Sequence, residues 1–426
     1  MTFPNTNQVA HFDPRSQLVF LDKYRAKDIE QDYKEGKLSN LRVPLSTVYH
    51  ELNHWADCVG TVWGNKYLHK IYQSFDVLPT VKYSGSEVNF YKFLEVHDQD
   101  RKLSYDDYYR VHHTAPKAHS HKRTWRIEFS SGVEFSVTGR PDEKNPIIFV
   151  KFRDRDSERL IIRQPLCVAS ILETTSVWSE MLTQILLIRA TDGPEKVVDM
   201  VLMEREFLDR LYAEELTLYS APVHLMAHFA SISETIDAYR MAALVAFVTL
   251  NLVSSHFRQI KTTKSMDAWS DRFSAFRKNE SIPFAFFCIC AGAPKWSEEL
   301  TPFAWLEAAL RNAGLPTFDE ILSHAVKVLK KDSESCQRKD LAKHQVYLRE
   351  LGIKWLHDRW QRKDPAVGLP QVLDLELCTP PIFDSEGNLF KIFGSKFDTG
   401  RFDPKLIYDV DASLHTQILN LRSACR

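Results

Sequence analysis

The sequence has little glycine, 14 in 426 residues, and many aromatic side chains, with 26 Phe, 15 Tyr and 9 Trp. So few glycines argue against a turn-rich all-β fold. So many aromatic residues argue against disorder, because they supply apolar surface that a folded core can bury. Hydrophobic residues make up 44% and charged residues 26%, which are ordinary values for a soluble globular protein. The composition favours packed helices, and the length suffices for two or more cores.

The chain also lacks an excess of charge of either sign. It contains 55 Lys and Arg against 56 Asp and Glu, so the formal net charge is −1 at pH 7. A protein of this balance has no global field that would attract nucleic acid or anionic lipid. Short basic runs such as 121–123 are typical of a solvated loop. We therefore expect no nucleic acid and no membrane among its partners, and the oligomeric state stays open.

Long hydrophobic runs are missing as well. The longest apolar stretch, 241–253, falls short of the roughly 20 residues that a membrane span needs. The first residues do not combine a charged segment with an apolar one, so we expect no secretory signal. The seven cysteines are odd in number and scattered, and only Cys288 and Cys290 lie close together. This usage is typical of buried thiols in a reducing compartment, and we expect a cytoplasmic protein.

Hydrophobic periodicity divides the chain into helical and strand-like regions. Pro44 marks the start of a helix with a buried stripe formed by Leu52, Trp55, Ala56 and Val59. Alternation over 125–129 and 133–137, around a turn at Ser131-Gly132, predicts one β-hairpin. The stretches 147–152 and 159–163 predict a second hairpin, and a long helix should follow over 167–189.

The most informative residues are the five from His50 to His54, His-Glu-Leu-Asn-His. On a helix, positions i and i+4 share a face, so both imidazoles can reach one metal ion while Glu51 lies beside it. Zinc binds imidazole nitrogens and keeps an open position for water in catalytic sites, where a carboxylate can take the water proton. With 16 histidines in the chain, a chance match to this pattern is expected roughly 0.04 times. The alternative is a pair of histidines that only form hydrogen bonds in the interior.

This pentapeptide resembles the active-site helix of the zincin metallopeptidases and is similar to that of the thermolysin-like branch, the gluzincins. The resemblance implies that His50 and His54 are zinc ligands and that Glu51 is the general base. It also implies a third ligand, a glutamate on a later helix. The metzincin pattern is not met, because Asp57 and Gly60 stand where that pattern has its glycine and its third ligand.

Glu173 is the candidate for the third ligand. It is a lone acid in the apolar start of the helix predicted over 167–189, and a buried carboxylate needs a partner such as a metal ion. Glu180 follows two turns later on the same face of this helix, and we expect it to contact a metal ligand without binding the metal itself. Val177 stands where gluzincins often have an acid. Alternatives for the third ligand are Glu180, Asp57 or a loop histidine, and Glu173 could instead be an acid favoured by the helix N-terminus.

Other polar residues have weaker claims on the site. Asp57 could orient a ligand or be a plain surface acid. His224 and His228 also stand four residues apart but lack a neighbouring glutamate, so we expect them in the core. One of these two, or Tyr219, could stabilise an oxyanion. The histidines within 112–121 indicate a flexible polar loop.

The sequence thus predicts a predominantly helical α+β fold, in which a zincin-like active-site helix with inserted β-hairpins precedes a large helical region. The turn residues 191–194 should separate a catalytic, metal-binding domain, 1–190, from a mainly helical domain, 191–426, with short strands and loops near 364–403. The predicted function is that of a Zn²⁺-dependent metallopeptidase acting on a protein or peptide. The alternatives are a metal-dependent hydrolase of a non-peptide substrate and a non-enzymatic helical interaction protein.

Overall fold

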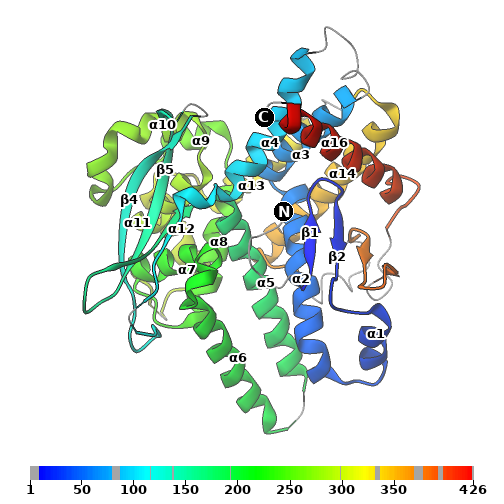
Figure 1. Ribbon diagram of the computed structural model, residues 1–426. Helices are drawn as coiled ribbons and strands as arrows, with labels where there is room; N and C mark the ends of the chain where they lie inside the picture. Colours follow the sequence, from blue (N-terminus) through cyan, green and yellow to red (C-terminus); the bar gives the residue numbers. More distant parts are fainter. Residues whose placement is uncertain are drawn as a thin grey trace.

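A computed structural model of the chain shows a predominantly helical α+β fold with two small sheets, as the composition and patterning predict (Figure 1). Among the described residues, no helix combines the length and apolarity that crossing a bilayer requires. The structure describes residues 9–78, 87–115, 117–136, 139–191, 193–297, 299–331, 336–368, 378–391 and 397–424.

The elements follow one another in three groups. The N-terminal group comprises β1 (His11–Asp13), β2 (Leu18–Phe20), α1 (Ala26–Lys34), α2 (Leu38–Gly60), α3 (Val62–Val77) and α4 (Glu87–Ser104). The middle group comprises η2 (Asp107–Tyr109), β3 (Val111–His112), β4 (Arg126–Phe135), β5 (Pro141–Arg153), β6 (Leu160–Leu166), α5 (Val168–Ala190), α6 (Glu195–Leu211), η3 (Glu214–Leu216), α7 (Thr217–Ala230) and α8 (Thr235–Leu250). The last group comprises α9 (Ser254–Gln259), η4 (Lys264–Arg272), α10 (Phe273–Lys278), α11 (Ile282–Gly292), α12 (Pro302–Asn312), α13 (Phe318–Lys331), α14 (Lys339–Arg362), β7 (Ile382–Phe383), β8 (Leu389–Phe390) and α16 (Pro404–Ala424).

Helix α2 carries the His-Glu-Leu-Asn-His segment and begins earlier than predicted. It starts at Leu38 and runs through Pro44, so the predicted start at Pro44 is wrong. Proline lacks an N–H and therefore removes one bond from the helix, which the remaining turns and the buried stripe of α2 tolerate. The stripe itself is confirmed, because its four side chains are at most 1% exposed.

The larger sheet has the strand order β3-β6-β5-β4 and is antiparallel throughout. Strand β4 runs without a turn through Ser131 and Gly132, so the first predicted hairpin is wrong; residues 137 and 138 of its expected second strand lie outside the described residues. Gly132 serves packing instead, since a Cβ there would lie 2.8 Å from a ring atom of Phe149 on β5. The second hairpin, β5–β6, is confirmed.

The smaller sheet joins segments from the two ends of the chain. Strand β1 pairs with β2, β2 runs parallel to β7, and β7 pairs with β8, in the order β1-β2-β7-β8. The expected short strands near 364–403 are thus present in part, and residues 369–377 and 392–396 lie outside the described residues. No prediction from the sequence placed strands before residue 45.

Two large clusters of buried apolar side chains form most of the interior of the described part, and a small third cluster consists of Tyr109, Ile147 and Phe149. Helices α2 and α5 lie side by side where the two large clusters meet (Figure 1). One large cluster contains both Trp125 and Leu356, and the other contains both Trp55 and Trp355. Each large cluster therefore draws residues from both sides of position 190. The division into 1–190 and 191–426 stays a prediction.

Helix α14 crosses α2 at very close range. A Cβ on Gly352 would lie 1.9 Å from the carbonyl oxygen of Val59, so any side chain at position 352 would push the helices apart. This contact fixes the end of α2 against the later part of the chain.

Candidate metal centre

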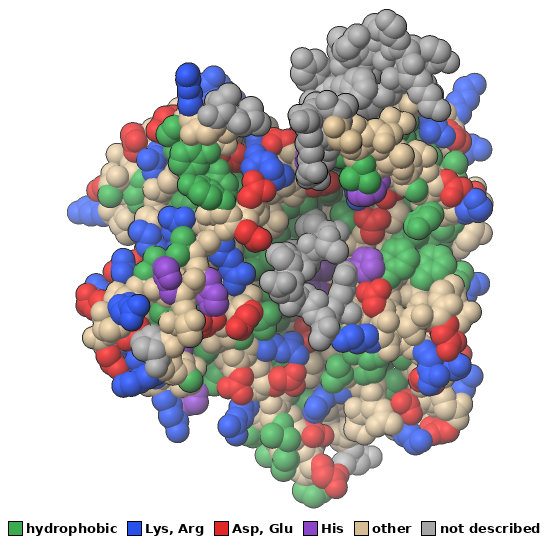
Figure 2. All heavy atoms as spheres, in the orientation of Figure 1, with side chains coloured by type: hydrophobic (Ala, Val, Ile, Leu, Met, Phe, Trp, Pro, Cys, Tyr) green, Lys and Arg blue, Asp and Glu red, His purple; other side chains and the backbone are tan. Residues whose placement is uncertain are grey.

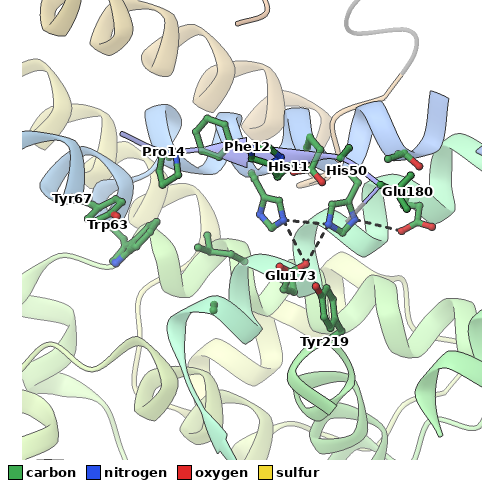
Figure 3. A pocket seen from close by; sticks show the side chains of 17 residues that line it. His11, Phe12, Pro14, His50, Trp63, Tyr67, Glu173, Glu180 and Tyr219 are labelled. Carbon is green, nitrogen blue, oxygen red and sulfur yellow. Dashed lines mark hydrogen bonds and ion pairs between the residues drawn. The ribbon is translucent and has the colours of Figure 1, made fainter. Parts of the chain in front are cut away.

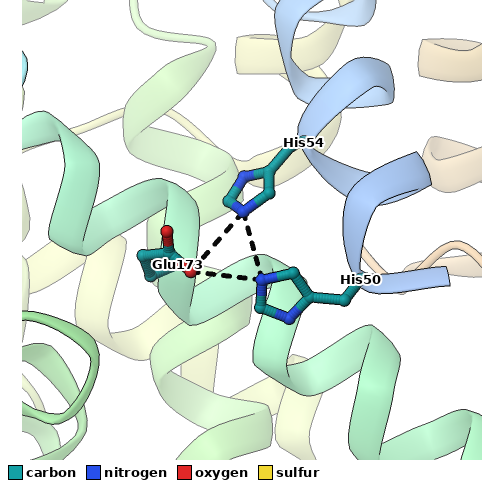
Figure 4. A group of neighbouring side chains, drawn as sticks. All are labelled: His50, His54 and Glu173. Carbon is teal, nitrogen blue, oxygen red and sulfur yellow. Dashed lines mark hydrogen bonds and ion pairs between the residues drawn. The ribbon is translucent and has the colours of Figure 1, made fainter. Parts of the chain in front are cut away.

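Helices α2 and α5 bring the three predicted ligands together (Figure 4). The Nε2 atoms of His50 and His54 are 3.2 Å apart. Oε2 of Glu173, in the second turn of α5, lies 3.2 Å from Nε2 of His50 and 3.5 Å from Nε2 of His54. Three candidate ligand atoms therefore surround one point, and the group can hold a metal ion.

The burial of Glu173 supports a cation site at this point. The residue is 1% exposed, and its Oε2 atom is buried without a hydrogen-bond partner among the described residues. The two imidazoles beside this oxygen would satisfy it as ion pairs only if they were protonated, whereas a metal ion would satisfy it beside neutral rings. The alternative interpretation, in which Glu173 is an acid stabilised only by its place near the helix N-terminus, does not explain why it is buried against two imidazoles.

A chain of ionic contacts supports His50 from behind. Oε2 of Glu180 lies 3.4 Å from Nδ1 of His50 (Figure 3). The guanidinium of Arg210 on α6 donates to Oε1 of Glu180 at 2.6 Å. A carboxylate on the far nitrogen of a metal-binding histidine orients the ring and raises its basicity. The sequence predicted this role for Glu180 but gave no sign of Arg210.

We expect Glu180→Gln to weaken metal binding by roughly 10- to 100-fold, the usual effect of losing such a carboxylate. The substitution keeps the shape of the side chain but removes the charge that faces His50. Competition titration with a chromophoric chelator measures the affinity. Glu206→Gln is the matched control, because Glu206 also pairs with Arg210 but makes no described contact with His50. Equal effects of the two variants would contradict the assignment of Glu180.

The protonation equilibria show how strongly these groups interact in the absence of a metal. Burial opposes the charged form of His50, but Glu173 and Glu180 outweigh it and raise the imidazole pKa well above its ordinary value. Burial likewise opposes ionisation of Glu173, yet the two histidines lower its pKa to about 2. Burial is again outweighed at Glu180, where His50 and Arg210 lower the pKa to about 2. Both carboxylates are therefore ionised, and a metal ion that binds His50 must displace the proton from its imidazole.

The three ligands open into a cavity of about 230 Å³ (Figure 3). Glu51, the predicted base, lines this metal pocket beside the ligands and is 8% exposed. Figure 3 shows Trp63 and Tyr67 at one end of the pocket, Glu180 at the other, and Tyr219 next to Glu173. Residues of the N-terminal strand region complete the wall: Val9, Ala10, His11, Phe12 and Pro14.

Asp57 is a buried residue that helps to hold helices together, and its interpretation as a surface acid is wrong. It is 0% exposed and accepts hydrogen bonds from Arg359 at 2.6 Å and from Thr175 at 2.5 Å. Arg359, also 0% exposed, donates as well to Oδ1 of Asn53 at 3.0 Å. Asn53 in turn accepts from Ser179 on α5. This buried polar network fixes α2, α5 and α14 against one another next to the ligands.

The remaining candidate histidines lie away from the metal pocket. His224 is in the core as predicted, where Nε2 lies 2.7 Å from the carbonyl oxygen of Leu211 and burial lowers its pKa to about 4. His228 is exposed, so its prediction as a core residue is wrong. His112 pairs with Glu214. None of the histidines in 112–121 lines the metal pocket.

Comparison with known proteins gives no match: no family model, curated protein or solved structure matches the chain. The metal centre is supported by its geometry, by its burial and by the chemistry of its three ligand atoms.

On the face shown in Figure 2, acidic and basic side chains are interspersed, in keeping with the near-zero net charge.

Proposed function

We propose that this protein is a zinc-dependent hydrolase that cleaves peptide bonds. The observation that carries the proposal is the spacing of the three ligand atoms, 3.2, 3.2 and 3.5 Å. A tetrahedral ion with bonds of about 2.0–2.1 Å separates its ligand atoms by about 3.3–3.4 Å. The spacing thus fits zinc with one position left for water or substrate, and Glu51 lies beside it.

The ligand types also favour zinc over other divalent ions. Calcium and magnesium take oxygen ligands, whereas this site offers two imidazole nitrogens. Two histidines and a carboxylate also bind iron(II) in oxygenases, but octahedral bonds of about 2.1 Å would separate neighbouring ligand atoms by only about 3.0 Å. A carboxylate in the position of Glu51 suits proton transfer from water, which favours hydrolysis.

His50, His54 and Glu173 would hold the zinc ion, which when bound lowers the pKa of a water towards about 7 and polarises a carbonyl group. Glu51 accepts the proton of the attacking water and delivers it to the leaving nitrogen. Tyr219 faces the same pocket, and burial raises the pKa of its phenol. The phenol therefore stays protonated and can donate a hydrogen bond to the developing oxyanion.

The position of strand β1 favours a peptide as the substrate. Among the described residues β1 pairs only with β2, so it is an edge strand, and two of its residues, His11 and Phe12, line the metal pocket. An extended peptide can add to such an edge through main-chain hydrogen bonds. None of the residues in the two hairpins predicted from the sequence lines the pocket.

The test combines metal analysis with proteolysis of the full chain. We expect one zinc per chain by mass spectrometry of the metal, cleavage of a denatured protein substrate, loss of cleavage after chelation, and recovery when zinc is restored. A chain with bound zinc that hydrolyses only non-peptide substrates would support the first alternative. A chain that binds no zinc would support a helical interaction protein. Consumption of oxygen by the iron-loaded chain, without hydrolysis, would assign the site to the oxygenases.

A further inference from the structure

A second cavity adjoins the metal pocket on the side of Glu180. It has a volume of about 170 Å³ and shares His50, Glu180 and Tyr219 with the metal pocket. We call this cavity the side chamber; its other lining residues are Val177, Arg210, Leu216, Ser220 and Tyr239. Glu180, which the two cavities share, lies at the opposite end of the metal pocket from Trp63 and Tyr67 (Figure 3). The side chamber therefore lies beside a substrate held at the metal, and Tyr219 borders both cavities.

The walls of the side chamber are mostly apolar and aromatic. Val177 and Tyr239 are 6% and 2% exposed, and Leu216 and Tyr219 are partly buried. An apolar cavity of about 150 Å³ in another protein holds a benzene molecule. A cavity of this size can accept one ring-sized side chain and would exclude a bicyclic one.

The charged groups at the chamber neutralise one another. Arg210 donates to Glu180 at 2.6 Å and to Glu206 at 2.5 Å, and Glu180 also faces His50. A charged substrate side chain would thus enter an apolar space without a free partner of opposite sign, which is unfavourable. The side chamber therefore selects against charged side chains.

Ser220 adds one polar requirement. The residue is 1% exposed, lines the side chamber, and its Oγ atom is buried without a hydrogen-bond partner among the described residues. Native structures rarely leave a buried hydroxyl unpaired. A hydroxyl group on an entering side chain can both donate to Ser220 and accept from it.

We propose that the side chamber binds the substrate side chain next to the scissile bond and that Ser220 favours tyrosine there over phenylalanine. This inference rests on the proposed peptidase function and names the substrate class of the same site. The volume of the side chamber admits both the tyrosine and the phenylalanine ring. Its charged groups are already paired with one another, which disfavours acidic and basic side chains. The Ser220 hydroxyl can form a hydrogen bond with the phenol of tyrosine but not with the phenyl group of phenylalanine.

The test uses pairs of peptides that differ only by tyrosine or phenylalanine at each residue flanking the cleavage site. The zinc-loaded protein should prefer tyrosine roughly fivefold in kcat/KM at one of these positions, the effect of one net hydrogen bond. Ser220→Ala should bring that ratio close to one. Ser413→Ala is the matched control, because Ser413 is an exposed helical serine on α16, and it should leave the ratio as in the wild type.

Val177→Phe provides an independent test, since the added ring would fill the side chamber. It should shift the preference at the same position towards alanine and glycine, and thermal unfolding checks that the variant is folded. A wild-type protein that cleaves peptides with no preference for tyrosine, or whose preference survives Ser220→Ala, would overturn the chamber assignment alone. A protein that cleaves no peptide at all would overturn the proposed function, and the chamber assignment with it.

Discussion

Glu51→Gln should keep the metal and lose hydrolysis, with kcat falling by at least roughly 10²- to 10⁴-fold, the usual contribution of a general base. The amide cannot accept a proton from water, whereas His50, His54 and Glu173 remain in place to bind zinc. Metal analysis and the cleavage rate are measured on the same preparation. Glu51 makes none of the described contacts that join the three ligands. The substitution should therefore lower the cleavage rate without lowering the zinc content.

Glu204→Gln is a suitable control, because Glu204 is an exposed acid on α6, away from the metal pocket. It should cleave at the wild-type rate. Turnover by Glu51→Gln at the wild-type rate would exclude Glu51 as the base. Loss of zinc from this variant would instead make Glu51 a ligand.

Glu173→Ala should cost more metal affinity than any other change on α5. The variant removes one of three ligand atoms, so the loss should exceed the roughly 10- to 100-fold effect of a carboxylate that acts through a histidine. It also leaves the two imidazoles without their closest counter-charge. Competition titration of zinc on wild type, Glu173→Ala and Glu180→Gln places the three affinities on one scale.

The expected order is wild type, then Glu180→Gln, then Glu173→Ala as the weakest binder. Full occupancy of Glu173→Ala would show that the third ligand lies elsewhere. If Glu180→Gln were the weaker of the two variants, Glu180 would be the better candidate.

Much of the candidate site could be predicted because its residues are recognised from their near neighbours in the sequence. The spacing of His50 and His54 depends only on helix geometry, and Glu173 stood out as a single acid in an apolar helix. The error at Ser131-Gly132 arose from the same local reasoning. A serine-glycine pair signals a turn, but the ring of Phe149 on the neighbouring strand accounts for this glycine.

The parts that could not be predicted depend on contacts between distant segments. Arg210 reaches Glu180 from another helix, and β1 reaches the metal pocket through a sheet that includes residues near position 382. The pairing of Asp57 with Arg359 spans 302 positions. Hydrophobic periodicity describes one element at a time and cannot identify such partners.

The buried pair of Asp57 and Arg359 has a consequence for synthesis of the chain. Asp57 leaves the ribosome long before Arg359 does, and until then its carboxylate has no cationic partner in the place that the folded protein gives it. An unpaired charge in that interior would cost several kcal/mol. The helix that carries Glu51 therefore reaches its final position only when most of the polypeptide has been made.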